Sequence, residues 1–188
     1  LDEALAALAD AKPRQIDLAS VNGRYFHTLS GVGFFSQMAR AREETRGLWA
    51  GRLLSVGLAF MRAVRRTGRF TLDLEIDGRR QTVDAFAALV TNNRFGDDWR
   101  RARVDEGVLE LHVAEEQGAL ARISAGVGLI SGNWRNNEGV HSFTAREVVI
   151  THQRRRTWVA TDGERVREHF PLRYRIEPKA LSVLMPSG

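Results

Sequence analysis

Two short acidic segments contain the residue types that could perform chemistry in this chain. They are Asp105-Glu106-Gly107 and Asp162-Gly163-Glu164. Paired carboxylates near a turn can bind a hard cation or take the proton of a hydroxyl group. An Asp-Gly step is also a common hairpin turn, and Asp77-Gly78 is expected to be one. The residue pattern alone leaves both interpretations open for the two acidic segments.

Several other kinds of site are missing from the sequence. It has no cysteine, which excludes disulfides and thiolate metal sites. It also lacks a Walker-type phosphate loop, a Gly-x-Gly-x-x-Gly fingerprint, a His-Glu-x-x-His motif and a Gly-x-Ser-x-Gly elbow. The histidines show no spacing of metal ligands and are expected to be structural. They are His27, His112, His141, His152 and His169.

The chain is basic, with a formal net charge of +5, and lysine occurs only at Lys12 and Lys179. A basic surface attracts polyanions such as nucleotide phosphates and anionic lipids, although a high-GC genome would also favour arginine. Residues 152–158 combine three arginines with Trp158 and could bind phosphates. A solvated strand face is the simpler interpretation of that run.

The elements expected to position these residues are mostly strands. Alternating apolar residues and turn signals predict strands over 15–20, 24–30, 70–76, 81–91, 108–113, 145–151, 156–160, 172–176 and 181–184. Helical spacing predicts helices over 1–11, 34–44, 49–66 and 119–131. The 188 residues suit one domain. The expected fold is mainly β with inserted helices, in an antiparallel β-sandwich.

The helix expected over 49–66 has one apolar stripe flanked by arginines. The stripe consists of Leu53, Leu54, Gly57, Leu58, Met61 and Val64. A basic amphipathic helix can lie on a membrane, but the commoner arrangement packs such a stripe on a sheet. No uncharged stretch is long enough to cross a bilayer.

Read in order, several segments resemble the second domain of the diacylglycerol kinase catalytic family. Residues 104–111 are similar to its Leu-Asp-Asp-Gly-x-Leu-x-Val stretch, and residues 159–164 contain its Asp-Gly-Glu signature. Residues 16–26, 30–34, 51–59, 89–93 and 176–186 resemble further family segments in the same order. The family includes bacterial lipid kinases and the sphingosine and ceramide kinases.

The resemblance implies that residues 1–188 form the carboxy-terminal, lipid-substrate domain of a larger enzyme. The family's nucleotide-binding domain, with its Gly-Gly-Asp-Gly-Thr motif, would precede it, and the isolated chain is expected to be inactive. The implied reaction transfers phosphate from ATP, with Mg²⁺, to the hydroxyl of diacylglycerol or a sphingoid-like lipid. The implied location is the cytoplasm, at the periphery of a membrane. No nucleic-acid partner is implied. A homodimer is one possible oligomeric state.

The resemblance also implies roles for particular residues. Glu164 takes the place of the family's general base, with Asp162 beside it. Glu106, with the carbonyl groups of Arg103 and Val108, takes the place of the family's magnesium ligands. This sequence departs from the family where Glu106 replaces an aspartate, which puts the magnesium site in doubt. Phe35 replaces a usual acidic residue, and residues 96–99 lack a common Gly-Gly-Gly run.

Two other functions stay open at this stage. NAD kinase combines similar domains and would act on a soluble dinucleotide, which the apolar helix over 49–66 disfavours. A non-catalytic module that binds anionic lipid would use residues 152–158 instead of the acidic segments.

Overall fold

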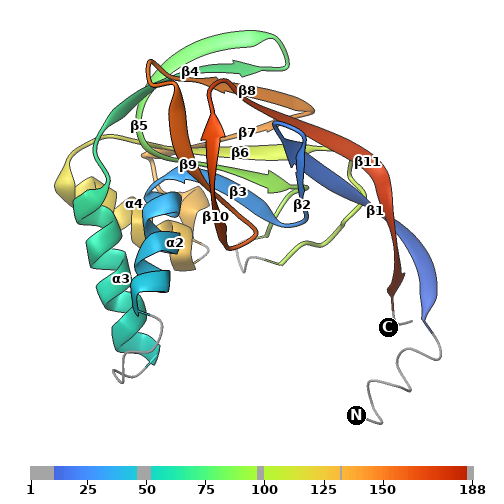
Figure 1. Ribbon diagram of the computed structural model, residues 1–188, viewed down its shortest axis with the longest axis horizontal. Helices are drawn as coiled ribbons and strands as arrows, with labels where there is room; N and C mark the ends of the chain where they lie inside the picture. Colours follow the sequence, from blue (N-terminus) through green and yellow to red (C-terminus); the bar gives the residue numbers. More distant parts are fainter. Residues whose placement is uncertain (1–10, 46–51, 97–99, 132, 186–188) are drawn as a thin grey trace.

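The computed structural model describes residues 11–45, 52–96, 100–131 and 133–185. Within these ranges, eleven strands form one antiparallel sheet, accompanied by three α-helices and a 3-10 turn (Figure 1). The strands are β1 Lys12–Val21, β2 Arg24–Phe26, β3 Leu29–Gly33, β4 Phe70–Ile76, β5 Arg79–Asn92, β6 Leu109–Glu115, β7 Val140–Ala145, β8 Glu147–Thr151, β9 Arg156–Thr161, β10 Glu164–His169 and β11 Leu172–Met185. The helices are α2 Phe34–Thr45, α3 Arg52–Arg66, α4 Ala119–Ser131 and the turn η1 Trp134–Asn136.

The long strand β5 divides the sheet into two halves. Its first half pairs with β4, whereas its second half pairs with β3 along one edge and with β6 along the other. The register with β6 shifts between Ala85 and Ala87, a bulge of the kind that bends a strand. One half therefore holds β4, β8, β11, β1 and β2, and the other holds β10, β9, β3, β6 and β7.

The main hydrophobic core lies where these two halves of the curled sheet face each other. Leu72 and Leu74 of β4 contribute from one half, and Val113 of β6 and Val159 of β9 contribute from the other. Tyr174 of β11 is fully buried in the same cluster. Because both halves bury alternate residues in one core, the single sheet has the packing of a β-sandwich.

The three helices cover the outer face of β5 and β6 and form a second apolar cluster (Figure 1). Phe34 of α2 contacts Phe60 of α3 and Phe86 of β5, with ring centroids 5.7 and 6.1 Å apart. The predicted stripe of α3 was wrong in part. Val64 is buried, but Leu58 and Met61 are each 40% exposed, and the described residues that α3 buries beside Val64 are Ala59 and Ala63.

The antiparallel β-fold with inserted helices is confirmed, with differences in detail. The strand expected over 24–30 is broken at His27 and Thr28, and the two strands expected over 172–184 are one strand, β11. β7 and β10 were not predicted. The helix expected over 1–11 and the first residues of the one expected over 49–66 lie outside the described residues, apart from Ala11. Among the described residues, no helix has the length and apolarity needed to cross a membrane.

Candidate functional site

Asp162 closes the turn between β9 and β10 and holds a second loop in place. Asp162 and Gly163 both have positive φ, +48° and +88°, which an Asp-Gly hairpin turn requires. The Asp162 carboxylate accepts hydrogen bonds from the backbone N–H groups of His27 at 2.7 Å, Thr28 at 2.8 Å and Leu29 at 3.1 Å. The resemblance places Asp162 beside the general base, and in the structure both of its oxygens are engaged by backbone donors. Asp162 is a positioning residue.

Glu164 follows this turn as the first residue of β10, and it is exposed. Its backbone pairs with Thr161 across the hairpin. In the described part of the chain, its carboxylate has no hydrogen-bond or ion-pair partner. The rigid turn therefore presents an unengaged carboxylate two residues after the anchored Asp162. Of the two acidic residues at this turn, Glu164 is the one with the freedom to accept a proton.

His27 and Arg101 lie against the anchored turn. Arg101 donates from Nη1 to the His27 carbonyl at 2.8 Å, and its guanidinium lies 5.4 Å from the centre of the Phe95 ring. Partial burial and the charge of Arg101 lower the pKa of His27, while the charge of Asp162 opposes them. Sequence reasoning assigned no role to Arg101, which places a cation beside the acidic turn.

We expect Arg101→Gln to raise the pKa of His27 and Asp162→Asn to lower it further, because each change removes the charge that shifts it. The measurement is an NMR titration of the His27 ring proton. In the wild-type chain, a lowered pKa in the folded state means that protonation favours unfolding. The free energy of unfolding should therefore decrease as the pH falls through about 6.5, the ordinary histidine value. Shifts in the opposite directions would contradict this arrangement of charges.

A buried asparagine connects this turn, through β1, to the other acidic segment at residues 105–107. Asn92, at the end of β5, donates from Nδ2 to the carbonyl of Asp17 and to the carbonyl of His27, both at 2.9 Å. Its side chain is fully buried. Asn92 thus ends β5 at the point where β1 and the β2–β3 connection meet.

Asp17 is the strongest anchor of the site and was missed as a functional residue. It is 1% exposed in β1, and its carboxylate accepts the backbone N–H groups of Gly107 at 2.7 Å and Lys179 at 2.8 Å. Lys179 has a positive φ of +55° at the irregular step where β11 leaves its first register with β1. The only signal in the sequence was an acidic residue inside an apolar strand, which is typical of a satisfied buried carboxylate.

The structure thus brings the two acidic segments to one edge of the sheet. The connection runs from Asp162 through His27, Asn92 and Asp17 to Gly107. Every link joins a side chain to a backbone group, and the side chains that make the links are Asp162, Asn92 and Asp17. The two segments lie at the β9–β10 turn and in the loop before β6, and Asp17 joins this region to β1.

Two of the groups predicted to bind magnesium, the Glu106 carboxylate and the Val108 carbonyl, have partners within the protein. Oε2 of Glu106 accepts the backbone N–H of Arg94 at 3.1 Å, and Oε1 of Glu106 lies 3.9 Å from the Arg94 guanidinium. The Val108 carbonyl accepts the N–H of Asn93 at 2.9 Å, and the Arg103 side chain turns to Asp105. The described residues contain no group of three acidic or histidine side chains that could hold a metal.

The negative charge of the neighbouring Asp105 is likewise balanced by arginine side chains. Its burial opposes ionisation, but the hydrogen bond from Arg103 and the charges of Arg103 and Arg14 together lower the pKa of Asp105. Arginine side chains therefore pair with both acidic residues of this loop.

We expect magnesium ions to leave the Tm of this chain unchanged. A ligand that binds only the folded state at a hundred times its Kd adds about 2.7 kcal/mol to the free energy of unfolding. Thermal unfolding with magnesium chloride and with a chelator measures the effect. A rise of several degrees with magnesium would show that the loop around Glu106 binds the ion.

Most of the chain matches a known protein family. Residues 31–185 match the family described as the YegS C-terminal NAD kinase beta sandwich-like domain. The match includes both acidic segments and the whole sheet from β5 to β11.

Two solved structures from Bacillus anthracis str. Sterne share the fold. One, assigned as a diacylglycerol kinase, has a TM-score of 0.66 at 17% identity and covers 94% of this chain and 58% of that chain. Another, described as a diacylglycerol kinase, has a TM-score of 0.61 at 14% identity and covers 94% of this chain and 55% of that chain. The chain therefore spans little more than half the length of these proteins, and the likeness is one of fold.

Proposed function

Since the chain belongs to the YegS C-terminal NAD kinase beta sandwich-like domain family, we propose that it forms the lipid-facing domain of an ATP-dependent kinase. Joined to a nucleotide-binding domain, it would complete a site that transfers phosphate to the hydroxyl of diacylglycerol or a sphingoid-like lipid. The names of the two Bacillus anthracis structures support a kinase of this type.

The observation that carries the proposal is the free carboxylate of Glu164 on an anchored turn. Asp162 holds that turn through three backbone N–H groups, so Glu164 extends from a rigid support. A general base must be positioned within hydrogen-bond reach of the proton that it removes. We assign Glu164 this role toward the lipid hydroxyl and Asp162 the role of holding the turn.

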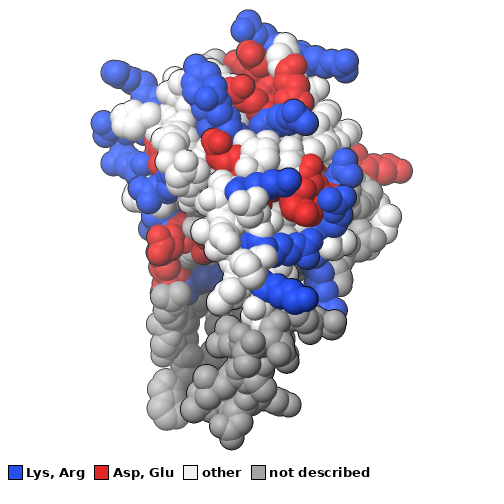
Figure 2. All heavy atoms as spheres, turned by 90° about the vertical axis from the view of Figure 1, so that its right-hand side faces the viewer, with Lys and Arg blue, Asp and Glu red and all other residues white. Residues whose placement is uncertain are grey.

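Phosphate transfer also requires compensation of the phosphate charge. Magnesium would enter with the ATP held by the nucleotide-binding domain, rather than at Glu106. Arg101 adds a fixed positive charge beside the turn. Figure 2 shows the face that carries β1, β2 and β11, where Lys and Arg side chains are spread among Asp and Glu. The net charge of +5 of the whole chain attracts polyanions such as ATP and anionic lipid.

The test is phosphate transfer from labelled ATP by the full-length protein to a panel of lipids and, in parallel, to NAD. We expect labelled product with a lipid that carries a free hydroxyl and none with NAD. Labelled NADP would instead identify a NAD kinase, which the family's description also accommodates. Vesicle binding without any labelled product would favour a non-catalytic module and overturn the proposal.

A further inference from the structure

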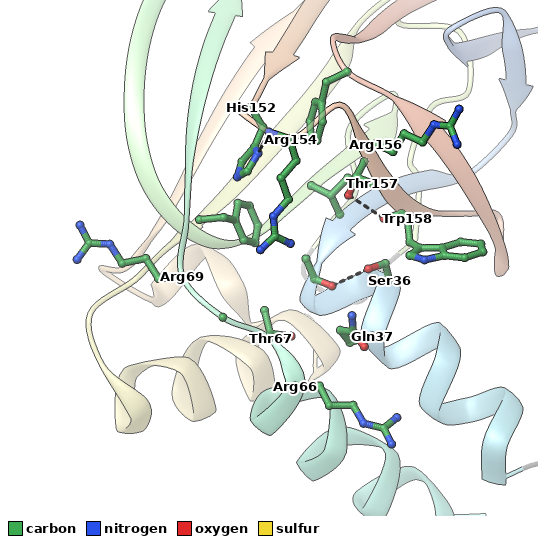
Figure 3. A pocket seen from close by; sticks show the side chains of 15 residues that line it. Ser36, Gln37, Arg66, Thr67, Arg69, His152, Arg154, Arg156, Thr157 and Trp158 are labelled. Carbon is green, nitrogen blue, oxygen red and sulfur yellow. Dashed lines mark hydrogen bonds between the residues drawn. The ribbon is translucent and has the colours of Figure 1, made fainter.

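A pocket of about 450 Å³ lies away from the acidic edge, between the helices and the start of β9 (Figure 3). The N-terminal turn of α2 and the C-terminal end of α3 form one side of it. The loop between β8 and β9 forms the other side. Arg156 at the pocket and Thr161 beside the acidic turn are the two ends of β9. At about 3.3 Å per residue, the pocket lies roughly 17 Å along this strand from that turn.

The pocket is lined by four arginines and by no acidic residue. They are Arg66, Arg69, Arg154 and Arg156. Arg66 is paired with Glu44 and Arg69 with Asp84. Among the residues that the structure describes, Arg154 and Arg156 have no carboxylate partner. Figure 3 shows the guanidinium of Arg154 directed into the pocket, whereas Arg66, Arg69 and Arg156 point outward from its rim. The pocket therefore has one inward cation whose charge no carboxylate balances.

Two further side chains supply polar groups inside the pocket. The Nδ1 atom of His152 accepts the backbone N–H of Arg154 at 2.8 Å, which leaves the ring proton on Nε2 as a donor. The Oε1 atom of Gln37 is buried and has no hydrogen-bond partner in the described part of the chain. A phosphate ester that carries a hydroxyl group would accept from Arg154 and His152 and donate to Gln37.

Aromatic and apolar groups adjoin the charged ones. His152 stacks on Phe170 with centroids 5.4 Å apart, and Phe70 and Trp158 complete the lining. Trp158 is 40% exposed. α3, whose last residue Arg66 lines the pocket, also exposes Met61 and Leu58, five and eight residues before it. Unpaired arginine beside exposed apolar side chains is suited to a ligand that has a phosphate at one end and hydrocarbon at the other.

We propose that this pocket binds the phosphate headgroup of an anionic phospholipid and docks the domain on a membrane surface. Arg154 contacts the phosphate, Arg156 adds charge at the rim, and the exposed side chains of α3 contact the lipid. Because the pocket lies at the far end of β9 from Glu164, docking is separate from phosphate transfer. It holds whether or not the acidic edge is catalytic.

The test measures cosedimentation of this chain with phosphatidylcholine vesicles that contain, or lack, phosphatidylglycerol. We expect binding only to the vesicles with phosphatidylglycerol. The double variant Arg154→Gln/Arg156→Gln should bind them roughly tenfold to thirtyfold more weakly, since each arginine near a membrane contributes about a tenfold or smaller factor. Both side chains are exposed and lack carboxylate partners, so the variant should unfold at the same temperature as the parent.

The matched control is Arg79→Gln/Arg146→Gln, which removes the same charge near the β4–β5 turn, away from the pocket. It should bind the phosphatidylglycerol vesicles within about twofold of the parent, as expected for two arginines outside the contact. If both double variants lost the same vesicle affinity, binding would depend on the net positive charge of the chain and not on the pocket. That result would overturn the proposal. A third arm titrates inorganic phosphate while the His152 ring resonance is followed. Phosphate binding at His152 without vesicle binding would identify a soluble phosphate as the ligand and overturn the lipid assignment.

Discussion

In the full-length protein, Glu164→Gln is expected to lower the rate of phosphate transfer by roughly two to four powers of ten, the usual contribution of a general base. The amide keeps the size of the side chain but cannot accept the hydroxyl proton. Because the Glu164 carboxylate has no partner in the described part of the chain, the change removes no contact that stabilises the fold. The measurement is the initial rate with saturating lipid and ATP, together with the Tm of the variant.

The matched control is Glu168→Gln at the other end of β10. Glu168 pairs with Arg24 and accepts a hydrogen bond from Asn22, and both lie outside the proposed catalytic edge. Its variant should retain most of the activity. If Glu164→Gln kept more than about a tenth of the wild-type rate, its assignment as the base would be wrong. The fold and the family membership would be unaffected.

Asp17→Ala is expected to have the largest effect on stability. The substitution removes a buried carboxylate and leaves the part-buried N–H groups of Gly107 and Lys179 without their acceptor, and each such loss costs about 1–3 kcal/mol. We expect a decrease of about 3–5 kcal/mol in the free energy of unfolding, which corresponds to a Tm about 10 °C lower. Urea unfolding followed by circular dichroism gives both the midpoint and the slope.

Glu75→Ala is the control for loss of a carboxylate from a strand. Glu75 forms an ion pair with Arg80 and keeps 38% of its side chain exposed. Surface pairs of this kind contribute about 1 kcal/mol or less. Equal destabilisation by both substitutions would show that Asp17 does not anchor the Glu106 loop and β11 as the hydrogen bonds indicate.

Asp17 and Asp162 have the same structural role at the two acidic segments. Each of these carboxylates accepts hydrogen bonds from backbone N–H groups and thereby holds a loop in place. Glu164, by contrast, is presented to solvent by a loop that Asp162 anchors. The acidic residues of this edge therefore differ according to what surrounds them, and only Asp17 and Asp162 are shown to hold loops.

The local features of the sequence correctly predicted much of the fold. Alternating apolar residues marked β4, β6 and β8, and helical spacing marked α2, α3 and α4. Asn22-Gly23, Asp77-Gly78 and Asp162-Gly163 all adopt the positive φ angles of tight turns. These features depend on neighbouring residues only, so a single chain is enough to recognise them.

Two strands with a single partner strand, β7 and β10, were missed. β10 reads Glu-Arg-Val-Arg-Glu-His and β7 carries few apolar residues, so neither shows a strong alternation. Each becomes a strand because its backbone pairs with a neighbour, β9 or β6. Edge strands of this kind owe their structure to hydrogen bonding more than to burial of their own side chains.

By itself, the sequence determined the strands with alternating residues, the Asp-Gly turns and the order of motifs that resembles a kinase domain. Only the tertiary structure decided which carboxylates are free. Asp162 contacts residues more than 130 positions away, and Asp17 contacts Lys179 across almost the whole chain. Whether a carboxylate supports a loop or accepts a proton depends on those distant backbone donors, which no local pattern encodes.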